Sequence, residues 1–577
     1  MSVVPSTQYA VQFTGVDEIT INPAKPVASV GPHGIMLQIE ACGICFSDTK
    51  LLHAFDSHPR KSEVVSGLTE EELAEIPGYQ PGSLPTVPGH EPVARIIEVG
   101  EKVTHFRVGE RVLVQADWKH LPTAKSNAAF GYNFEGALQE FVVVDERCIV
   151  APNGDEFLIR VAEEPTAAAI GLIEPWATVE GAYAWRERRT LKAGGHLLVV
   201  ADADAAVSSI ADLVAEAAPG EITAVGTTNE ALGVAATTTA SLAELGEQRF
   251  DDIIYFGADA GIITDLGARL AARSIFNIVL GGKRIEGVTK VDVGRVHYDF
   301  IRYCGTTGSD PAAGYAWIPE TGEVRAGDKL AIMGAAGPMG LMHTMRAVVL
   351  GLPDISIDAT DLSASRLEHL ASVIDPVAAE TGVPVTYLNT SEQQLEAGYS
   401  YVVVMVPAPA LIAEAVTIAG EGAIVNAFAG IPAGTLAEID VQGVIERQIF
   451  MIGTSGSDVS DMRTVVNKIE RGDYDTTISL DSITGMAGFN DAINAVINRT
   501  SGGKIMVYPQ LHDLPLITLK DLADHLPEVA AKLEGGLWTR AAEEELLRGG
   551  NGNWRMKNCR SYFDRNLVGI ESKVKRK

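Results

Sequence analysis

The sequence predicts an α/β protein in which a β-rich domain is followed by two copies of a unit built on a doubly wound parallel sheet. Short Val- and Ile-rich runs alternate with Gly, Pro and Asp over residues 1–165, as in strands joined by turns. The following region repeats itself in order, and its second copy places three evenly spaced glycines between an apolar run and a helical pattern. The length of 577 residues allows roughly three to five domains.

Two predicted strands of the β-rich region lie beside residues that can bind a metal. Ile35–Ile39 runs toward Cys45, and Val93–Val99 follows His90. A thiol and an imidazole are donors that bind Zn²⁺. Each residue alone has a simpler explanation, a small buried residue or a turn, but the pair beside two strand ends indicates one shared metal.

From Glu163 onward the pattern becomes helical and then alternates between strand and helix. Ala167–Trp185 has helical spacing, and Glu174-Pro175 in its middle predicts a kink or break. Leu197–Val200 is fully apolar, as in a buried parallel strand, and Ala205–Ala217 fits the helix that follows.

This α/β unit occurs twice. The order of its helix, first strand and last loop is preserved between the copies, which chance similarity of Gly/Ser loops would not achieve. The matching segments are Tyr183-Ala184-Trp185 with Tyr315-Ala316-Trp317, Leu191–Gly194 with Val324–Gly327, and, without a gap, Asp292–Asp310 with Asp440–Asp458.

The second copy predicts a dinucleotide site. Gly334, Gly337 and Gly340, with Pro338 and Met339 between the last two, follow an apolar run and precede a helix. Such glycines permit a tight turn, close approach of the backbone to a pyrophosphate, and close packing of helix on strand. The alternative is three glycines that serve packing alone.

An acid at the end of the next predicted strand supports the nucleotide. Asp361 lies where a carboxylate would bind the adenosine ribose hydroxyls, with Asp358 as a rival. A carboxylate there disfavours a 2′-phosphate, so NAD is expected over NADP. Arg366 can also reach the ribose, which weakens that preference. The alternative for Asp361 is a helix cap.

The first copy has lost this arrangement. Asp202 and Asp204 stand near the positions of the glycines, and carboxylates would repel a pyrophosphate. We therefore expect a degenerate domain without a cofactor, with a structural role such as an oligomer contact.

Composition restricts the partners. A formal net charge of −29 argues against nucleic acid and anionic membranes, although residues 555–577 carry eight Lys and Arg in a basic tail. The start of the chain, Met1–Ala10, has no apolar core, and no apolar run reaches the roughly 18 residues of a membrane span, so a cytoplasmic protein is expected. Five unevenly spaced cysteines do not suggest a disulfide framework.

With these motifs together, the chain resembles the zinc-type medium-chain dehydrogenase/reductase family, most closely its sorbitol (polyol) dehydrogenase-like branch. The segments that carry the resemblance are Gly43-Ile44-Cys45-x-Ser47-Asp48, Pro88-Gly89-His90-Glu91, Gly109-Glu110-Arg111-Val112, Ile173-Glu174-Pro175, Gly334-x-x-Gly337-x-x-Gly340 and Gly503–Pro509. The resemblance implies a GroES-like catalytic domain, a Rossmann domain that binds NAD(P), and a catalytic zinc.

The resemblance also implies roles for residues. Cys45 and His90 match the zinc ligands, and Glu91 or Glu174 would complete the ligand set, directly or through water. Ser47 matches the hydroxyl that relays the substrate proton, and Asp48 the carboxylate that orients the zinc-bound imidazole.

The chain departs from the family pattern in four ways. Phe46 replaces the usual glycine, Lys50 stands where a histidine often continues the proton relay, the segment 118–134 lacks the four-cysteine structural zinc lobe, and the Rossmann unit is duplicated. Lys50 and His53 would suit a phosphate on the substrate, or are simply solvated.

The expected organisation is a GroES-like zinc domain (1–165 and 474–510), a degenerate Rossmann-like domain (166–312), an NAD-binding Rossmann domain (313–473) and a helical C-terminal extension with the basic tail (511–577). The expected activity is hydride transfer between NAD(H) and a secondary alcohol or ketone of a polyol, sugar or sugar phosphate, in a homo-oligomer such as a dimer or tetramer. The alternatives are a zinc-free quinone or enoyl reductase and a pseudoenzyme or scaffold.

Overall fold

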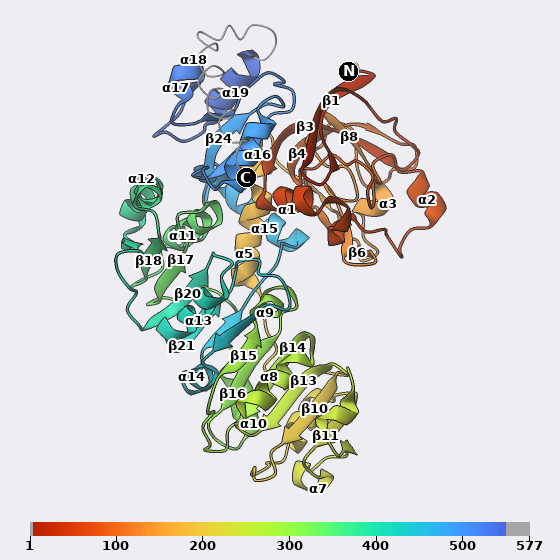
Figure 1. Ribbon diagram of the computed structural model, residues 1–577. Helices are drawn as coiled ribbons and strands as arrows, with labels where there is room; N and C mark the ends of the chain where they lie inside the picture. Colours follow the sequence, from red (N-terminus) through yellow and green to blue (C-terminus); the bar gives the residue numbers. More distant parts are fainter. Residues whose placement is uncertain (1–3, 550–577) are drawn as a thin grey trace, which may run out of the picture. The chain divides into compact units, whose positions relative to one another are not determined.

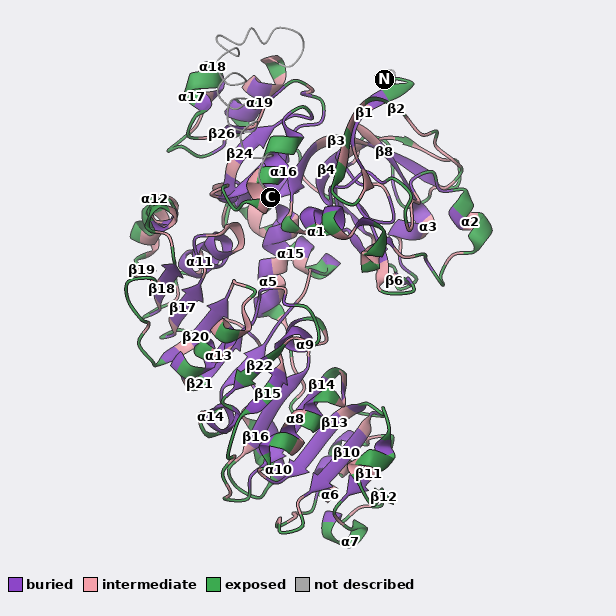
Figure 2. Ribbon diagram, in the orientation of Figure 1, coloured by how far each residue is buried: buried purple, intermediate pink, exposed green. Residues whose placement is uncertain are grey.

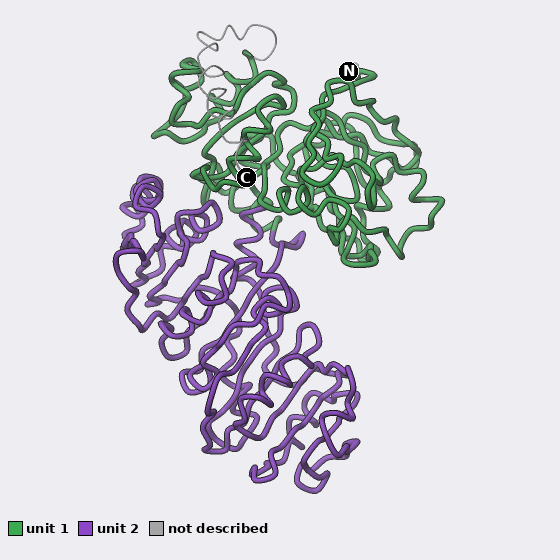
Figure 3. The backbone as a smooth tube through the Cα atoms, in the orientation of Figure 1, with its two compact units in different colours: residues 1–174, 462–577 green, residues 175–461 purple. Residues whose placement is uncertain are grey.

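The computed structural model describes residues 4–549 and divides them into two compact units (Figures 1 and 3). The first unit joins residues 1–174 to residues 462–577, and the second contains residues 175–461. None of the helices in the described part of the chain is long and apolar enough to cross a membrane.

The first unit is built on a mainly antiparallel sheet with the strand order β26-β24-β25-β3-β4-β5-β9, and β8 also pairs with β3. Its central strand β3 is buried along most of its length, since Ile35, Leu37 and Ile39 pack in the core. The strands are β3 (Gly34–Ile44), β4 (Glu91–Val99), β5 (Arg111–Val114), β8 (Phe141–Asp145), β9 (Leu158–Arg160), β24 (Leu480–Thr484), β25 (Lys504–Val507) and β26 (Ile517–Thr518).

The C-terminal extension packs on this unit through a buried carboxylate. Glu543 lies on α19 (Arg540–Gly549) and accepts the backbone N–H groups of Ala167 and Ala168 at 2.7 and 3.0 Å. These are the first residues of α4 (Ala167–Gly171), whose free N–H groups favour a negative charge. Tyr508 also donates to Glu543, at 2.8 Å. The basic tail lies outside the described residues.

The second unit contains two parallel six-stranded sheets of the same topology. Their orders, β12-β11-β10-β13-β14-β16 and β19-β18-β17-β20-β21-β23, are both the 3-2-1-4-5-6 order of a Rossmann fold. We call them the first lobe and the second lobe. The first-lobe strands are β10 (His196–Ala201), β11 (Glu221–Val225), β12 (Thr237–Thr239), β13 (Phe250–Phe256), β14 (Leu270–Val279) and β16 (Arg302–Thr306). The second-lobe strands are β17 (Lys329–Met333), β18 (Ser356–Asp361), β19 (Val385–Asn389), β20 (Tyr399–Val404), β21 (Ala419–Asn426) and β23 (Phe450–Ile452).

The first lobe is inserted into the second. Helix α5 (Ile173–Ala184) precedes the first lobe in sequence, yet its Tyr183 packs against Tyr401 and His343 of the second lobe. The chain enters the first lobe at Arg186 and leaves it at Thr321, and these two residues form a β-bridge. The expectation of two tandem Rossmann-type sheets is confirmed, while the exact domain limits expected from the sequence stay a prediction.

The two lobes share one hydrophobic core. Its cluster of buried side chains runs from Leu198 and Tyr255 in the first lobe to Val402 and Val425 in the second. Figure 2 shows the buried strands of both sheets. Joining them is an antiparallel pair of short strands, β15 (Thr289–Asp292) and β22 (Leu436–Ile439).

Candidate active site

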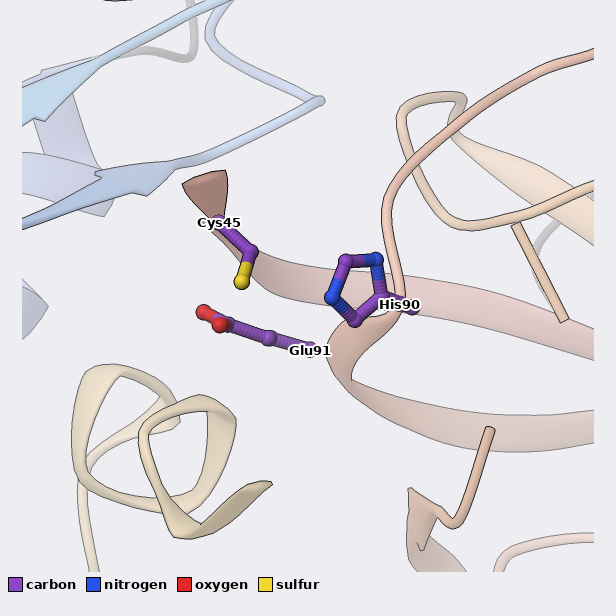
Figure 4. Close-up of side chains that lie close together, drawn as sticks. All are labelled: Cys45, His90 and Glu91. Atoms are coloured by element: carbon purple, nitrogen blue, oxygen red, sulfur yellow. The ribbon is translucent and has the colours of Figure 1, made fainter. Parts of the chain in front are cut away.

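The candidate metal ligands meet where β3 and β4 pair. Gly43 of β3 lies opposite Glu91, the first residue of β4, so Cys45 and His90 come to the same end of the sheet. A side chain at Gly43 would not fit, because a Cβ there would stand 2.1 Å from Oε2 of Glu91. Figure 4 shows Cys45, His90 and Glu91 pointing toward one another.

These three residues fit a divalent metal. One ligand atom from each lies within 4.8 Å of the others, and a sulfur, a nitrogen and a carboxylate oxygen are donors that zinc accepts. Glu91 is fully buried, and its Oε2 has no hydrogen-bond partner among the described residues. An unsatisfied buried carboxylate oxygen is costly, and a cation held between these three residues would offset that cost.

Asp48 holds two of the three residues in place. Its Oδ2 accepts the backbone N–H of Cys45 at 2.9 Å, and its Oδ1 lies 3.2 Å from Nδ1 of His90. Asp48 is fully buried in the first turn of α1 (Phe46–Ala54), the helix that Cys45 begins. The contact at Nδ1 leaves Nε2 as the imidazole nitrogen for a metal.

Lys504 is the residue that the sequence reasoning missed. Its Nζ donates to Oε1 of Glu91 at 2.6 Å, and both side chains are buried. Burial opposes the ammonium charge, but the negative charge of Glu91 and its hydrogen bond, together with the neighbouring acidic groups Cys45 and Glu174, outweigh burial and raise the pKa of Lys504. This lysine lies in Gly503–Pro509, one of the segments that carry the family resemblance, but only the pairing of β25 with β3 brings it to Glu91.

Glu174 lies near this cluster but does not belong to the group of three. Burial, and then the negative charge of Glu91, raise the pKa of the Glu174 carboxyl to about 7. Two carboxylates close together favour a cation between or beside them. Ser47 follows Cys45 by two residues, in the first turn of α1, and is partly exposed.

A cluster of rings and cations, also absent from the sequence reasoning, lies beside the imidazole. The buried ring of Tyr132 is 5.5 Å from His90 and stacks on His58 at 5.2 Å. Arg60 lies over Tyr132 and donates to Asp117 at 2.9 Å. Burial, and then the positive charges of Arg60 and Lys50, lower the pKa of His58 to about 4. No sequence spacing signals this cluster.

Two residues considered for a phosphate differ in their surroundings. Lys50 is exposed, with its Nζ 5.9 Å from the centre of the Phe46 ring. His53 forms an exposed pair with Asp17 at 2.5 Å. Lys50 is therefore the better candidate.

The glycine loop of the second lobe joins β17 to α11 (Pro338–Leu350). A Cβ at Gly340 would lie 2.5 Å from the carbonyl oxygen of Gly334, so the loop and helix pack too closely for any side chain. Gly337 precedes the helix, and Gly337, Pro338 and Met339 remain partly exposed. This arrangement places the start of a thirteen-residue helix beside an accessible loop, as pyrophosphate binding requires.

Asp361 is the last residue of β18, beside this loop. Its Oδ2 lies 3.3 Å from Nη2 of Arg366, and Nε of Arg366 donates to the carbonyl of Ala336 in the loop. Asp358 instead accepts the hydroxyl of Tyr399 at 2.7 Å, within the sheet. Of the two acids, Asp361 is at the nucleotide end.

The first lobe lacks the equivalent loop. Its β10 ends at Ala201, but α6 begins only at Ala211 and has seven residues, shorter than the predicted Ala205–Ala217. Asp202 accepts the hydroxyl of Tyr255 at 2.7 Å, and Asp204 pairs with Lys283 at 2.6 Å. Carboxylates therefore occupy the strand end where the second lobe has glycines.

A family model described as the alcohol dehydrogenase GroES-like domain matches residues 31–153. This range contains Cys45, Ser47, His90 and Glu91. The GroES-like domain expected from the sequence is therefore confirmed over these residues.

Curated relatives match part of the chain. Mannitol-1-phosphate 5-dehydrogenase of Aliivibrio fischeri is 27% identical over 248 residues, which are 39% of this chain and 57% of that protein. L-sorbose 1-phosphate reductase of Klebsiella pneumoniae is 27% identical over 229 residues, 37% of this chain and 54% of that protein. The chain thus matches little more than half the length of these relatives.

The solved structure of 2R,3R-butanediol dehydrogenase from Bacillus subtilis has the same fold. It superposes with a TM-score of 0.50 at 14% identity and covers 87% of this chain and 100% of that one.

Proposed function

We propose that this chain, whose residues 31–153 match the alcohol dehydrogenase GroES-like domain, is a zinc-dependent alcohol dehydrogenase of the polyol type within the medium-chain dehydrogenase/reductase family. It would transfer hydride between NAD(H) and a secondary alcohol or ketone of a polyol, sugar or sugar phosphate. The observation that supports this proposal most is the buried, unpaired Oε2 of Glu91 beside Cys45 and His90.

Cys45, His90 and Glu91 would hold the metal, and Glu174 would take the place of Glu91 or act through water. A zinc ion there would supply Lewis-acid polarisation of the alcohol oxygen, and a bound nicotinamide would supply the hydride acceptor. Ser47 receives the alcohol proton and passes it toward solvent. Asp48 keeps the imidazole in one orientation.

The second lobe would bind the nucleotide through Gly334, Gly337, Pro338, Met339 and Gly340. Asp361 would accept the ribose hydroxyls, which favours NAD over NADP. Arg366 already neutralises part of that carboxylate at 3.3 Å, so some use of NADP is compatible with the same geometry.

Zinc content is the first test of this proposal. Cys45→Ser should lose nearly all bound zinc, measured by mass spectrometry of the metal, and lower kcat/KM at least about 100-fold because a ligand is removed. Cys148→Ser replaces a buried cysteine of the same unit outside the cluster and is the matched control. A chain that purifies without zinc and stays active would support the zinc-free reductase, and one that binds neither zinc nor nucleotide would support the scaffold.

A substrate screen addresses the second half of the proposal. NAD reduction would be measured across polyols, sugar acids and their phosphates. If a phosphate is recognised, Lys50→Met should raise KM for the phosphorylated substrate more than for its unphosphorylated counterpart. Equal effects on both would remove Lys50 from phosphate recognition.

A further inference from the structure

The strands β15 and β22, which join the two lobes, are related by the internal repeat. Asp292 and Asp440 are equivalent, since each stands where its short strand ends and caps the next helix. Lys290 therefore corresponds to Glu438, and these two residues lie directly opposite each other in the antiparallel pair. Antiparallel pairing of a residue with its own equivalent places a local two-fold axis between the strands.

Contacts away from this axis also occur in equivalent pairs. A Cβ at Gly305 would meet Cγ1 of Ile445 at 2.9 Å, and a Cβ at Gly453 would meet Cα of His297 at 2.6 Å. Gly453 is the equivalent of Gly305, and Ile445 is the equivalent of His297. Each lobe thus receives the other's helix against the same glycine of its last strand or the loop after it.

A second pair of contacts obeys the same rule. Gln442 accepts the backbone N–H of Ile285 at 2.8 Å. Their equivalents, Gly294 and Ala433, also meet, because a Cβ at Gly294 would lie 2.8 Å from Cα of Ala433. The residue types differ between the two copies, but equivalent positions remain in contact.

The surface between the lobes is apolar and fully covered. Val291, Val296, Val444 and Ile445 are each at most 3% exposed and belong to the core that the lobes share. An interface with two-fold symmetry between copies of one sequence is the form that a homodimer contact takes.

We propose that the first lobe acts as a built-in partner subunit. It occupies, within the same chain, the face through which the second lobe would otherwise pair with another copy of itself. This role explains why the first lobe keeps its interface positions while carboxylates replace its glycines. The proposal does not depend on the metal, nucleotide or substrate. Any oligomer of this chain then uses other surfaces.

Cysteine pairs at the axis test the proposal in the full chain. Lys290 and Glu438 are exposed, so Lys290→Cys/Glu438→Cys should fold as the parent does. Opposed residues of antiparallel strands have Cα atoms about 4.5–5.5 Å apart, within the range of a disulfide. Oxidation, or a short bismaleimide, should link more than half of the molecules within one chain, and a reductant should reverse the disulfide.

Two controls separate the outcomes. Glu438→Cys alone would form a covalent dimer if a second chain met this face, because a two-fold partner would place its own residue 438 opposite. Lys290→Cys alone shows how much cross-linking arises from reaction of the introduced cysteine with the native cysteines of the chain. We expect neither single variant to give dimers, and no mixed products when isotope-labelled and unlabelled double variants are combined. Covalent dimers, mixed cross-links, or absence of any link in the double variant would overturn the proposal.

Discussion

The buried pair of Glu91 and Lys504 determines how much of the carboxylate is free for a metal. Lys504 occupies Oε1 at 2.6 Å, and Oε2 has no described partner. The lysine therefore occupies one oxygen of the carboxylate and leaves the other for the ion. Lys504 and a bound metal would each balance part of the negative charge of the buried Glu91 carboxylate.

Lys504→Met tests this division. Removing one member of a buried pair should lower the free energy of unfolding by about 3 kcal/mol in the metal-free protein, measured by urea denaturation. Saturating zinc should restore part of this loss because the ion supplies the missing positive charge. Lys504→Arg, which keeps the charge, is the control. A loss of equal size with and without zinc would contradict the assignment.

His343 provides a pH-dependent prediction. It is fully buried on α11, and its Nδ1 accepts a hydrogen bond from the hydroxyl of Tyr183 at 2.7 Å. Its Nε2 has no hydrogen-bond partner among the described residues. Burial, and then the positive charge of Arg346, lower the pKa of His343 to about 3. In the unfolded chain this imidazole becomes protonated near pH 6.5. The contribution of the neutral, buried His343 to the free energy of unfolding is therefore fully present above about pH 6.5 and is lost as the pH falls toward 3.

His343→Gln should reduce that acid sensitivity, since glutamine still accepts from Tyr183 and does not titrate. Between pH 7 and pH 5 the wild type should lose about 2 kcal/mol more than the variant. Urea denaturation of both proteins at the two pH values measures the difference. His369→Gln, on the neighbouring helix α12 (Ala364–Thr381), is an exposed control. An identical pH response of wild type and His343→Gln would exclude the effect.

Sequence reasoning reached single residues only where a motif marked them. Cys45, His90 and Glu91 lie at strand ends beside glycines, and the structure groups them together. Lys504 comes from a segment far along the chain, and the pairing of β25 with β3 brings it to the site. Tyr132 lies in a turn that no motif marks, and its ring is 5.5 Å from that of His90. Such proximity depends on sheet register, which no local pattern encodes.

At the scale of elements, helix α19 stabilises the start of α4. Thr166 caps α4 by accepting the backbone N–H of Ala169, and the carboxylate of Glu543 accepts the two preceding N–H groups, which would otherwise be unpaired. Since α4 also packs against Glu91 through Gly171, the extension indirectly supports the segment that carries the candidate metal ligand Glu91.

Glu543→Gln should lower the free energy of unfolding by about 2 kcal/mol, because charge-assisted bonds to two backbone N–H groups are weakened. Glu544→Gln, at the neighbouring exposed position, should change it by less than about 0.5 kcal/mol. Thermal and urea denaturation measure both. Equal stability of the two variants would show that the cap is dispensable.

For the whole molecule, the repeat and the order of elements were predictable because apolar runs and loop residues occur twice. The insertion was not, since sequence order placed α5 with the first lobe, whereas its Tyr183 packs on the second. Two similar lobes offer the helix nearly equivalent sites, and only three-dimensional packing distinguishes them.

The unequal lobes predict one nucleotide per chain. Isothermal titration with NAD should give a stoichiometry near one, and Gly337→Asp should abolish binding by placing a charge where the pyrophosphate lies. Asp204→Ala, in the first lobe, should leave the stoichiometry unchanged. Two bound nucleotides per chain would overturn the degenerate assignment.

The β-bridge between Arg186 and Thr321 has a consequence for how such a chain can arise. When a segment leaves and rejoins a fold at neighbouring residues, inserting or removing it costs almost no additional loop-closure entropy. Arg186 and Thr321, where the chain leaves and rejoins the second lobe, then stay paired whatever segment is inserted between them. A domain grafted at this junction in place of the first lobe would also have to cover the apolar face of the second lobe, because the two lobes share one hydrophobic core.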